Sequence, residues 1–244
     1  MLESFKRWVS GPPEPPEVKV ITAWAKQRQL TVKTVRDAEG VVVEGGAGDR
    51  LWRLEWGASQ RAYIKGHELR LRVDLGLSGA LQMLIISRGL AESLEGEAFN
   101  RFTEEMQTQV DHTLPEETRW LAMYPKLDGA TMGQLRQRFT ALSALPEQVK
   151  LWLTEELAAT LHHWQIQPAV AGRPVLLMTL RGRLYVRVPG DDLTPVMLDE
   201  VFRLFERAAK AAVAVSTTEV GSMPDLIDDE DATAWAPLLP PHGQ

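Results

Sequence analysis

Two stretches between Arg50 and Leu75, RLWRLEW and ELRLRVDL, alternate between apolar and charged residues. Successive side chains of a β-strand point to opposite faces of the sheet. The alternation therefore predicts two neighbouring strands with one apolar face in the core and one charged face toward solvent, where opposite charges can pair. The predicted core residues are Trp52, Leu54, Trp56, Leu69, Leu71, Val73 and Leu75. The predicted outward residues are Arg53, Glu55, Glu68, Arg70, Arg72 and Asp74.

Other segments predict further strands and several helices from the period of their apolar residues. The strand candidates are LTVKTV, GVVVEG, LQMLIIS and TRWLAMYPK. A late hairpin is predicted in RPVLLMTLRGRLYVRV, where Gly182 can supply the positive φ of a tight turn. Helices are predicted over 18–29, 90–110 and 146–164. A last helix is predicted from Pro195 onward, with Thr194 as its N-cap.

These elements together predict an α+β protein. We expect an antiparallel sheet in the first half packed with helices, then a helix–β-hairpin–helix layer, and a disordered C-terminal tail. Residues 1–17 are expected to form an amphipathic segment and a Pro-rich spacer. The α+β body covers 18–215, either as one domain or as two packed lobes at about 18–110 and 111–215. Residues 216–244 are expected to be an acidic disordered tail.

The excess negative charge is confined to the C-terminus. The 244 residues include 33 acidic and 27 basic ones, for a formal charge of −6. Six of the acids and no Lys or Arg lie beyond Lys210, so the other 27 acids balance the 27 basic residues. A neutral body without a basic stripe argues against nucleic-acid binding, which depends on clustered Lys and Arg. The lack of cysteine excludes disulfides, thiolate metal sites and a Cys nucleophile.

The N-terminal sequence MLESFKRWVSGPP lacks the apolar run of about 7–15 residues that a signal peptide needs. No segment reaches the roughly 18–20 apolar residues of a membrane-spanning helix. We therefore expect a soluble protein, located in the cytoplasm.

No local motif of a catalytic, nucleotide or metal site is found in the sequence. EGGAGD is followed by a predicted strand, whereas a phosphate loop needs a helix there. His162 and His163 are adjacent and would point about 100° apart on a helix, so they cannot share one metal ion. DLIDDED lacks the spacing and the turn glycine of a calcium loop. We therefore predict no cofactor and no metal. An enzyme with scattered catalytic residues is the less favoured alternative.

The segment between the two alternating strands, Gly57 to His67, is long for a hairpin connection. Long loops on a rigid sheet often carry function, so Tyr63, Lys65 and His67 form a candidate loop site. A solvated loop without a site is the alternative. A small-ligand or lipid-binding domain would hold its ligand in a pocket under this loop.

One face of the late hairpin is apolar on its first strand and Arg/Tyr/Arg on its second. Met, Tyr and Arg are enriched at the cores of protein interfaces. Met178, Arg183, Tyr185 and Arg187 are therefore candidate residues for partner binding or self-association. Cover by another part of the same chain is the alternative. The two-residue turn predicts the cross-strand pairs Leu180–Arg183, Met178–Tyr185 and Leu176–Arg187.

Both ends of the chain carry apolar residues away from the predicted core. Phe5 and Trp8 lie on the apolar side of the short N-terminal segment, which could order itself on a partner or a membrane surface. Trp235, Leu238 and Leu239 accompany a run of acids, a composition typical of short recognition peptides. All five are candidate partner-binding residues.

The order of the late helix, two strands and helix looks like part of the small acidic α+β chaperones that hold secretion substrates. This resemblance rests on element order and charge, and a likeness of folds does not transfer a function. The leading hypothesis is a non-catalytic protein-interaction or scaffold module, chaperone-like in outline. A small-ligand or lipid-binding domain is the first alternative, and an enzyme is the second.

Overall fold

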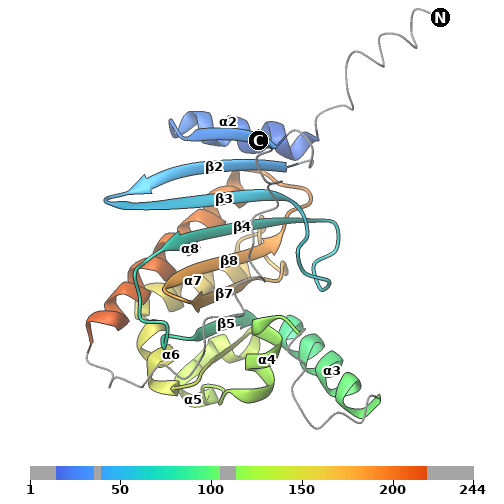
Figure 1. Ribbon diagram of the computed structural model, residues 1–244, viewed down its shortest axis with the longest axis vertical. Coiled ribbons are helices and arrows are strands. Elements are labelled where there is room, and N and C mark those ends of the chain that lie inside the picture. Colours follow the sequence, from blue (N-terminus) through green and yellow to red (C-terminus); the bar gives the residue numbers. More distant parts are fainter. Residues whose placement is uncertain (1–14, 36–39, 105–113, 219–244) are drawn as a thin grey trace, which may run out of the picture.

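The computed structural model describes residues 15–35, 40–104 and 114–218 (Figure 1). These residues form one eight-stranded antiparallel sheet in the order β1-β2-β3-β4-β8-β7-β5-β6. The late hairpin, β7 and β8, lies in the middle of the sheet between β4 and β5. Strands from both halves of the chain thus share one sheet. The strands are β1 Thr31–Val35, β2 Gly40–Ala47, β3 Arg50–Ala58, β4 His67–Asp74, β5 Met83–Ser87, β6 Phe139–Ser143, β7 Leu176–Leu180 and β8 Arg183–Pro189.

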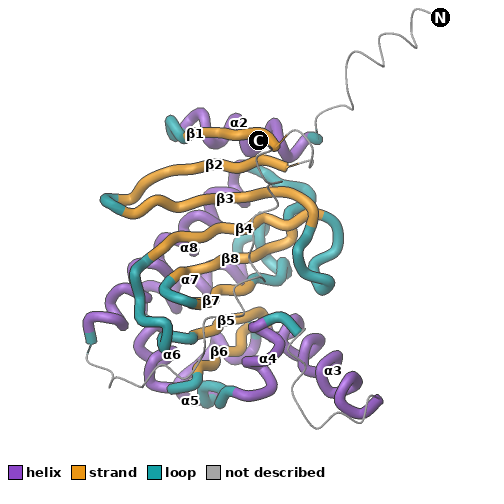
Figure 2. Tube along the Cα trace, viewed as in Figure 1, coloured by secondary structure: helices purple, strands orange, loops and turns teal. Residues whose placement is uncertain are grey.

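Helices pack on both faces of this sheet (Figure 2). The first face is covered by α2, α6, α7 and α8, whose buried residues belong to the larger hydrophobic core. Part of the second face is covered by α3 and α4. This arrangement confirms the predicted α+β class with an antiparallel sheet. The helices are α2 Pro16–Gln27, α3 Arg88–Glu104, α4 Glu116–Met123, α5 Gly129–Met132, the 3-10 helix η1 Gly133–Gln137, α6 Pro146–Trp152, α7 Glu155–Ile166 and α8 Pro195–Thr217.

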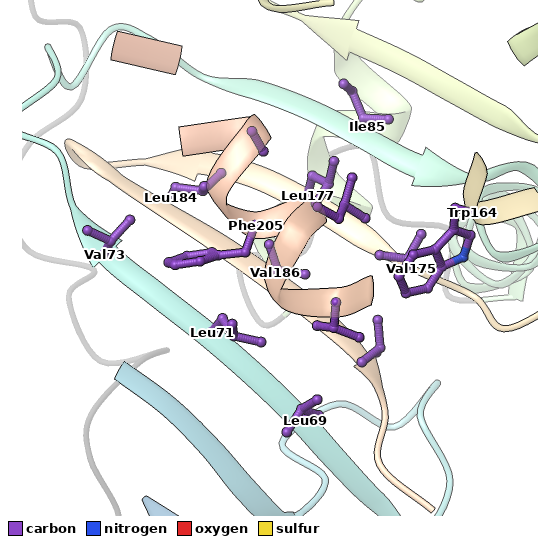
Figure 3. Packing of buried hydrophobic residues seen from close by; sticks show 14 of the residues in the cluster. Leu69, Leu71, Val73, Ile85, Trp164, Val175, Leu177, Leu184, Val186 and Phe205 are labelled. Carbon is purple, nitrogen blue, oxygen red and sulfur yellow. The ribbon is translucent and has the colours of Figure 1, made fainter. Parts of the chain in front are cut away.

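The predicted inward faces of β3 and β4 are confirmed. Trp52, Leu54 and Trp56 lie opposite Val73, Leu71 and Leu69, and all six are buried. Figure 3 shows the β4 residues beside Val186 and the ring of Phe205 from α8. The indole of Trp56 also donates a hydrogen bond to the Gly190 carbonyl (2.7 Å), so this buried polar group is satisfied. Trp52 and Trp56 are therefore core residues.

The second face divides into two halves. On β5, β6 and β7 its side chains are mainly apolar, and together with Tyr185 of β8 they form a smaller core with α3 and α4. On β2, β3 and β4 they are mainly charged, and no described helix covers them (Figure 1). A helix is held on a sheet by apolar contacts, so the boundary between the halves follows the change from apolar to charged residues.

The late hairpin turns as expected. The pairs Leu180–Arg183, Met178–Tyr185 and Leu176–Arg187 are all present. Both turn residues, Arg181 (φ 50°) and Gly182 (φ 79°), have positive φ, which matches the twist of a two-residue hairpin. A Cβ on Gly182 would lie 2.9 Å from the Leu77 carbonyl oxygen, so this position also needs glycine for space.

Three expectations about secondary structure were wrong. TRWLAMYPK lies mostly in helix α4, which Pro115 precedes and whose first turn has two acids, Glu116 and Glu117, that favour a helix N-terminus. The predicted helix over 146–164 is two helices, because the Thr154 hydroxyl caps a new one by accepting the Leu157 amide (3.3 Å). The edge strand β6 was not predicted, since its five residues are too short for a clear pattern.

Candidate functional site

The predicted loop site is a closed turn that packs on the protein. Residues 59–66 connect β3 to β4, and the Ser59 amide donates to the Gly66 carbonyl (3.2 Å) across the base of the loop. Gly66 has a φ of 72°, and a Cβ there would lie 2.4 Å from a carboxylate oxygen of Asp191. Glycine is therefore required for this segment to approach the chain beyond β8 so closely.

Under the loop, two of its side chains bind one buried carboxylate. Glu117 of α4 is fully buried, and Arg61 donates from Nε to Glu117 Oε1 (2.5 Å) and from Nη2 to Oε2 (3.4 Å). The Tyr63 hydroxyl donates to the same Oε1. We call Arg61, Tyr63 and Glu117, together with the nearby pair Glu68 and Arg187, the loop cluster. Its first three members fasten the loop to α4 and occupy the space beneath it.

Burial and pairing shift the titration of these groups. Burial raises the pKa of Tyr63 well above its usual value of 10.0, and the Glu117 carboxylate raises it further. Burial alone would raise the pKa of Glu117, but the Arg61 guanidinium outweighs it, so this pKa is lowered. Glu117 is therefore held as a carboxylate and Tyr63 as a neutral phenol at neutral pH.

The other pair of the loop cluster corrects a prediction. Glu68 was expected to face solvent with the other charged residues of β4, but it is fully buried. It forms an ion pair with the buried Arg187 of β8, and its Oε2 accepts the Gln60 amide (3.0 Å). The prediction was wrong because β8 was assigned to a separate layer, whereas it lies next to β4. The pair joins the start of the loop to the sheet.

The three predicted loop residues do not converge. Tyr63 points into the loop cluster, and Lys65 is exposed. The His67 ring stacks on Trp56 with centroids 4.4 Å apart, and its Nδ1 lies 2.9 Å from Asp191 Oδ1. His67 thus joins the loop to the segment after β8. The contacts of this loop fasten it to α4 and to the segment after β8, whereas the alternative to a loop site was a solvated loop.

The candidate interface on the late hairpin lies inside the protein. Met178, Tyr185 and Arg187 are each at most 3% exposed, and Met178 and Tyr185 belong to the smaller core with Leu94 and Trp120. The alternative of cover from within the same chain accounts for this face. Arg183 is exposed and pairs with Asp74 across the strands (3.2 Å). A partner could reach Arg183, but not the other three without displacing α3 and α4.

The candidate residues at the two ends lie outside the described residues. They are Phe5, Trp8, Trp235, Leu238 and Leu239. Their proposed roles in protein or membrane binding stay predictions, as does the cytoplasmic location.

From the amino-acid pattern alone, the charged half of the second face was expected to be only a solvated surface. We call this half the open face and define it by the outward residues of β1–β4 together with Arg183 of β8. Glu55 lies at its centre, within 4 Å of Arg53 Nε (2.7 Å), Arg70 Nη2 (3.4 Å) and Arg72 Nη2 (3.8 Å). Three guanidinium groups thus share one carboxylate. The excess of Arg over acids in ELRLRVDL and RLWRLEW could have indicated this positively charged face.

Among residues 15–35, 40–104 and 114–218, no group of three His, Cys, Asp or Glu side chains is placed to hold a metal ion. No helix in these ranges combines the length and the apolar character needed to cross a membrane. No protein-family model matches the chain, and the searches of curated proteins and of solved structures return no significant match.

Proposed function

We propose that this protein is a non-catalytic binding module that holds an acidic segment of a partner protein on its open face. The observation that carries the proposal is that half of one sheet face has a net positive charge and is covered by no helix of the described residues (Figure 1). The outward side chains of this face include Lys33, Glu44, Leu51, Arg53, Glu55, Arg70, Arg72, Asp74 and Arg183.

The charges of the open face favour an anionic partner. Five of these side chains are basic and three are acidic. The buried Glu68 also lies on this side, 3.5 Å from Arg70, but its charge is balanced by Arg187, so two positive charges remain on a body that is neutral as a whole. Glu55 contacts three arginines, of which Arg70 also lies 3.5 Å from Glu68. A carboxylate from a partner could therefore bind Arg53 and Arg72, which Glu55 only partly neutralises. Bidentate pairing with carboxylates is a property of arginine that lysine lacks.

Leu51 adds an apolar contact to the same face. Its side chain is 79% exposed, and it lies two residues before Arg53 on β3. An exposed leucine beside arginines suits a partner segment that carries apolar side chains among its acids. Such a segment would gain steering from the charges and affinity from the apolar contact.

The loop cluster supports a non-catalytic role. Its five side chains are paired with one another and largely buried, so their charges act within the fold. A general acid or base has to reach a substrate, and four of these five side chains are at most 7% exposed.

A photo-crosslinking amino acid at position 51 tests the proposal in cells. We expect it to capture a defined acidic segment of another protein. Arg53→Glu combined with Arg72→Glu should abolish the capture, since it replaces two attractive charges by two repulsive ones. The matched control is Arg203→Glu with Arg207→Glu, which makes the same charge change on exposed positions of α8.

Three results would contradict the proposal. The first is capture that survives the open-face variant, and the second is equal loss in the α8 control. The third is a crosslink to residues 219–244 of the same chain in place of a partner, which a chain ending at Thr218 would identify. Thermal unfolding of each variant confirms that the fold is retained.

A further inference from the structure

A second candidate site lies at the other end of the sheet from the open face. A cavity of about 570 Å³ is formed where β5 ends and α3 begins, next to the start of β6, the end of α7 and the segment that leads into β7. Small-molecule sites commonly have volumes of about 300–1,000 Å³. The cavity is therefore large enough for a small ligand, and it does not overlap the open face.

Three arginines line this cavity, against one acid. They are Arg88, Arg138 and Arg173, and the acid is Glu92. Arg138 is exposed. Arg88 and Glu92 form only a long ion pair, with 3.8 Å between Arg88 Nη1 and Glu92 Oε1. The net charge of the lining is thus about two positive charges in a body that is neutral.

The third arginine is fixed in place by neutral groups. Arg173 donates from Nη1 to the Asp191 carbonyl (2.9 Å) and from Nη2 to the Asp192 carbonyl (3.4 Å). These carbonyls are uncharged, so they orient the guanidinium without neutralising it. The carboxylate of Asp191 is directed to His67. The positive charge of Arg173 therefore remains available to an anion in the cavity.

Two buried nitrogen atoms of the lining lack a hydrogen-bond partner in the described part of the chain. They are Gln165 Nε2 and Arg88 Nε. A buried donor without an acceptor is unfavourable. Both nitrogens are closed off from the open space of the cavity, so they belong to the packed part of its wall. The first turn of the 17-residue helix α3, which includes Gly89 and Leu90, adds backbone amides at the same wall.

The remaining wall is apolar. Leu90, Phe139, Trp164 and Pro174 contribute to it, and Trp164 is held by a hydrogen bond from its indole to the Arg173 carbonyl (3.3 Å). This cavity has cationic donors on one side and aromatic and aliphatic groups on the other. It fits a ligand with one anionic end and one apolar end.

We propose that this cavity binds a small organic anion, a carboxylate or a phosphate ester, that carries an apolar or aromatic group. Arg88, Arg138 and Arg173 bind the anionic end, and the Phe139 and Trp164 side of the cavity takes the apolar end. This proposal is independent of the open face, since none of its residues belongs to that face.

Titration calorimetry on the full chain with four probes tests this assignment. The probes are phenyl phosphate, benzoate, inorganic phosphate and the neutral benzyl alcohol. We expect phenyl phosphate or benzoate to bind with a dissociation constant below about 1 mM. It should bind at least tenfold more tightly than inorganic phosphate and benzyl alcohol, and more weakly as salt is added. The tighter of the two aromatic anions identifies the preferred head group.

Arginine variants locate the bound anion. Arg88→Ala and Arg138→Ala should each weaken binding at least tenfold. Arg136→Ala is the matched control, since it removes the same charge two residues from Arg138 on a side chain that lies against Gly129, away from the cavity. The proposal is overturned if no anion binds up to about 10 mM. It is also overturned if Arg136→Ala weakens binding as much as Arg138→Ala, or if inorganic phosphate binds as tightly as phenyl phosphate.

Discussion

The loop cluster and the cavity at α3 both contain arginines, and they differ in what surrounds each guanidinium. In the loop cluster Arg61 and Arg187 are buried and each has its own carboxylate, from Glu117 and Glu68. In the cavity, Arg138 is exposed and Arg173 is bound to carbonyl oxygens. A buried charge has to be neutralised within the chain to be tolerated at all. An exposed charge does not need this, so of these two regions only the cavity keeps arginine charge for a ligand.

Removing a carboxylate from the loop cluster should have the largest effect on stability. Glu117→Ala leaves the buried Arg61 without its carboxylate, and breaking a buried pair in this way costs about 3–5 kcal/mol. Urea unfolding of wild type and variant measures the loss. Glu147→Ala, which removes an exposed acid from α6, should cost less than about 1 kcal/mol. Similar values for the two variants would mean that the loop cluster does not stabilise the fold.

Substitutions on the two faces of β4 should destabilise the protein to different extents. Leu71 is 1% exposed in the larger core, and Leu71→Ala should cost about 2–5 kcal/mol through lost apolar burial and a cavity. Arg72 on the open face should cost less than about 1 kcal/mol when changed to Ala. Thermal melts that rank Arg72 as the more damaging position would contradict the register of β3 and β4.

The loop cluster should also make stability depend on pH in the alkaline range. The pKa of Tyr63 is raised in the folded protein, so its contribution is complete below the unfolded value of 10.0 and is lost as the pH rises above it. The stability advantage of wild type over Tyr63→Phe should therefore shrink above about pH 10. Unfolding free energies measured in urea from pH 7 to 11 test this, and a constant difference would be inconsistent with a buried neutral Tyr63.

The lowered pKa of Glu117 has the opposite sign. Its contribution is present above the usual value of 4.5 and is lost as the pH falls through the lower folded value. The difference in unfolding free energy between wild type and Glu117→Gln should therefore narrow below about pH 4. A difference that widens on acidification would show that Glu117 is not held as a carboxylate.

The smallest effect is expected in the cavity. Arg138→Ala should change the free energy of unfolding by about 0.5 kcal/mol or less, because its side chain is exposed. A loss above about 2 kcal/mol would place Arg138 with the structural arginines. The cavity and the loop cluster would then not differ in how their arginines contribute to stability.

Local alternation was sufficient to predict which side chains of a strand belong to the core. Alternation is a local property with a period of two residues, so Trp52, Leu54 and Leu71 were placed in the core, and the cross-strand pair Met178–Tyr185 was predicted, before any tertiary contact was known. The N-cap Thr194 followed in the same way from short-range chemistry, and its hydroxyl accepts the Met197 amide.

The order of the strands in the sheet, and the partner of each buried side chain, could not be predicted from local patterns. Insertion of β8 beside β4 buries Glu68 with Arg187, and α3 and α4 bury Met178, although both residues are on faces that looked outward along the chain. The cavity combines Arg88, Arg138 and Gln165 from segments about 27 to 77 residues apart, and no local pattern links them. Periodicity reports the face of each residue, whereas the partner across that face depends on how distant segments pack.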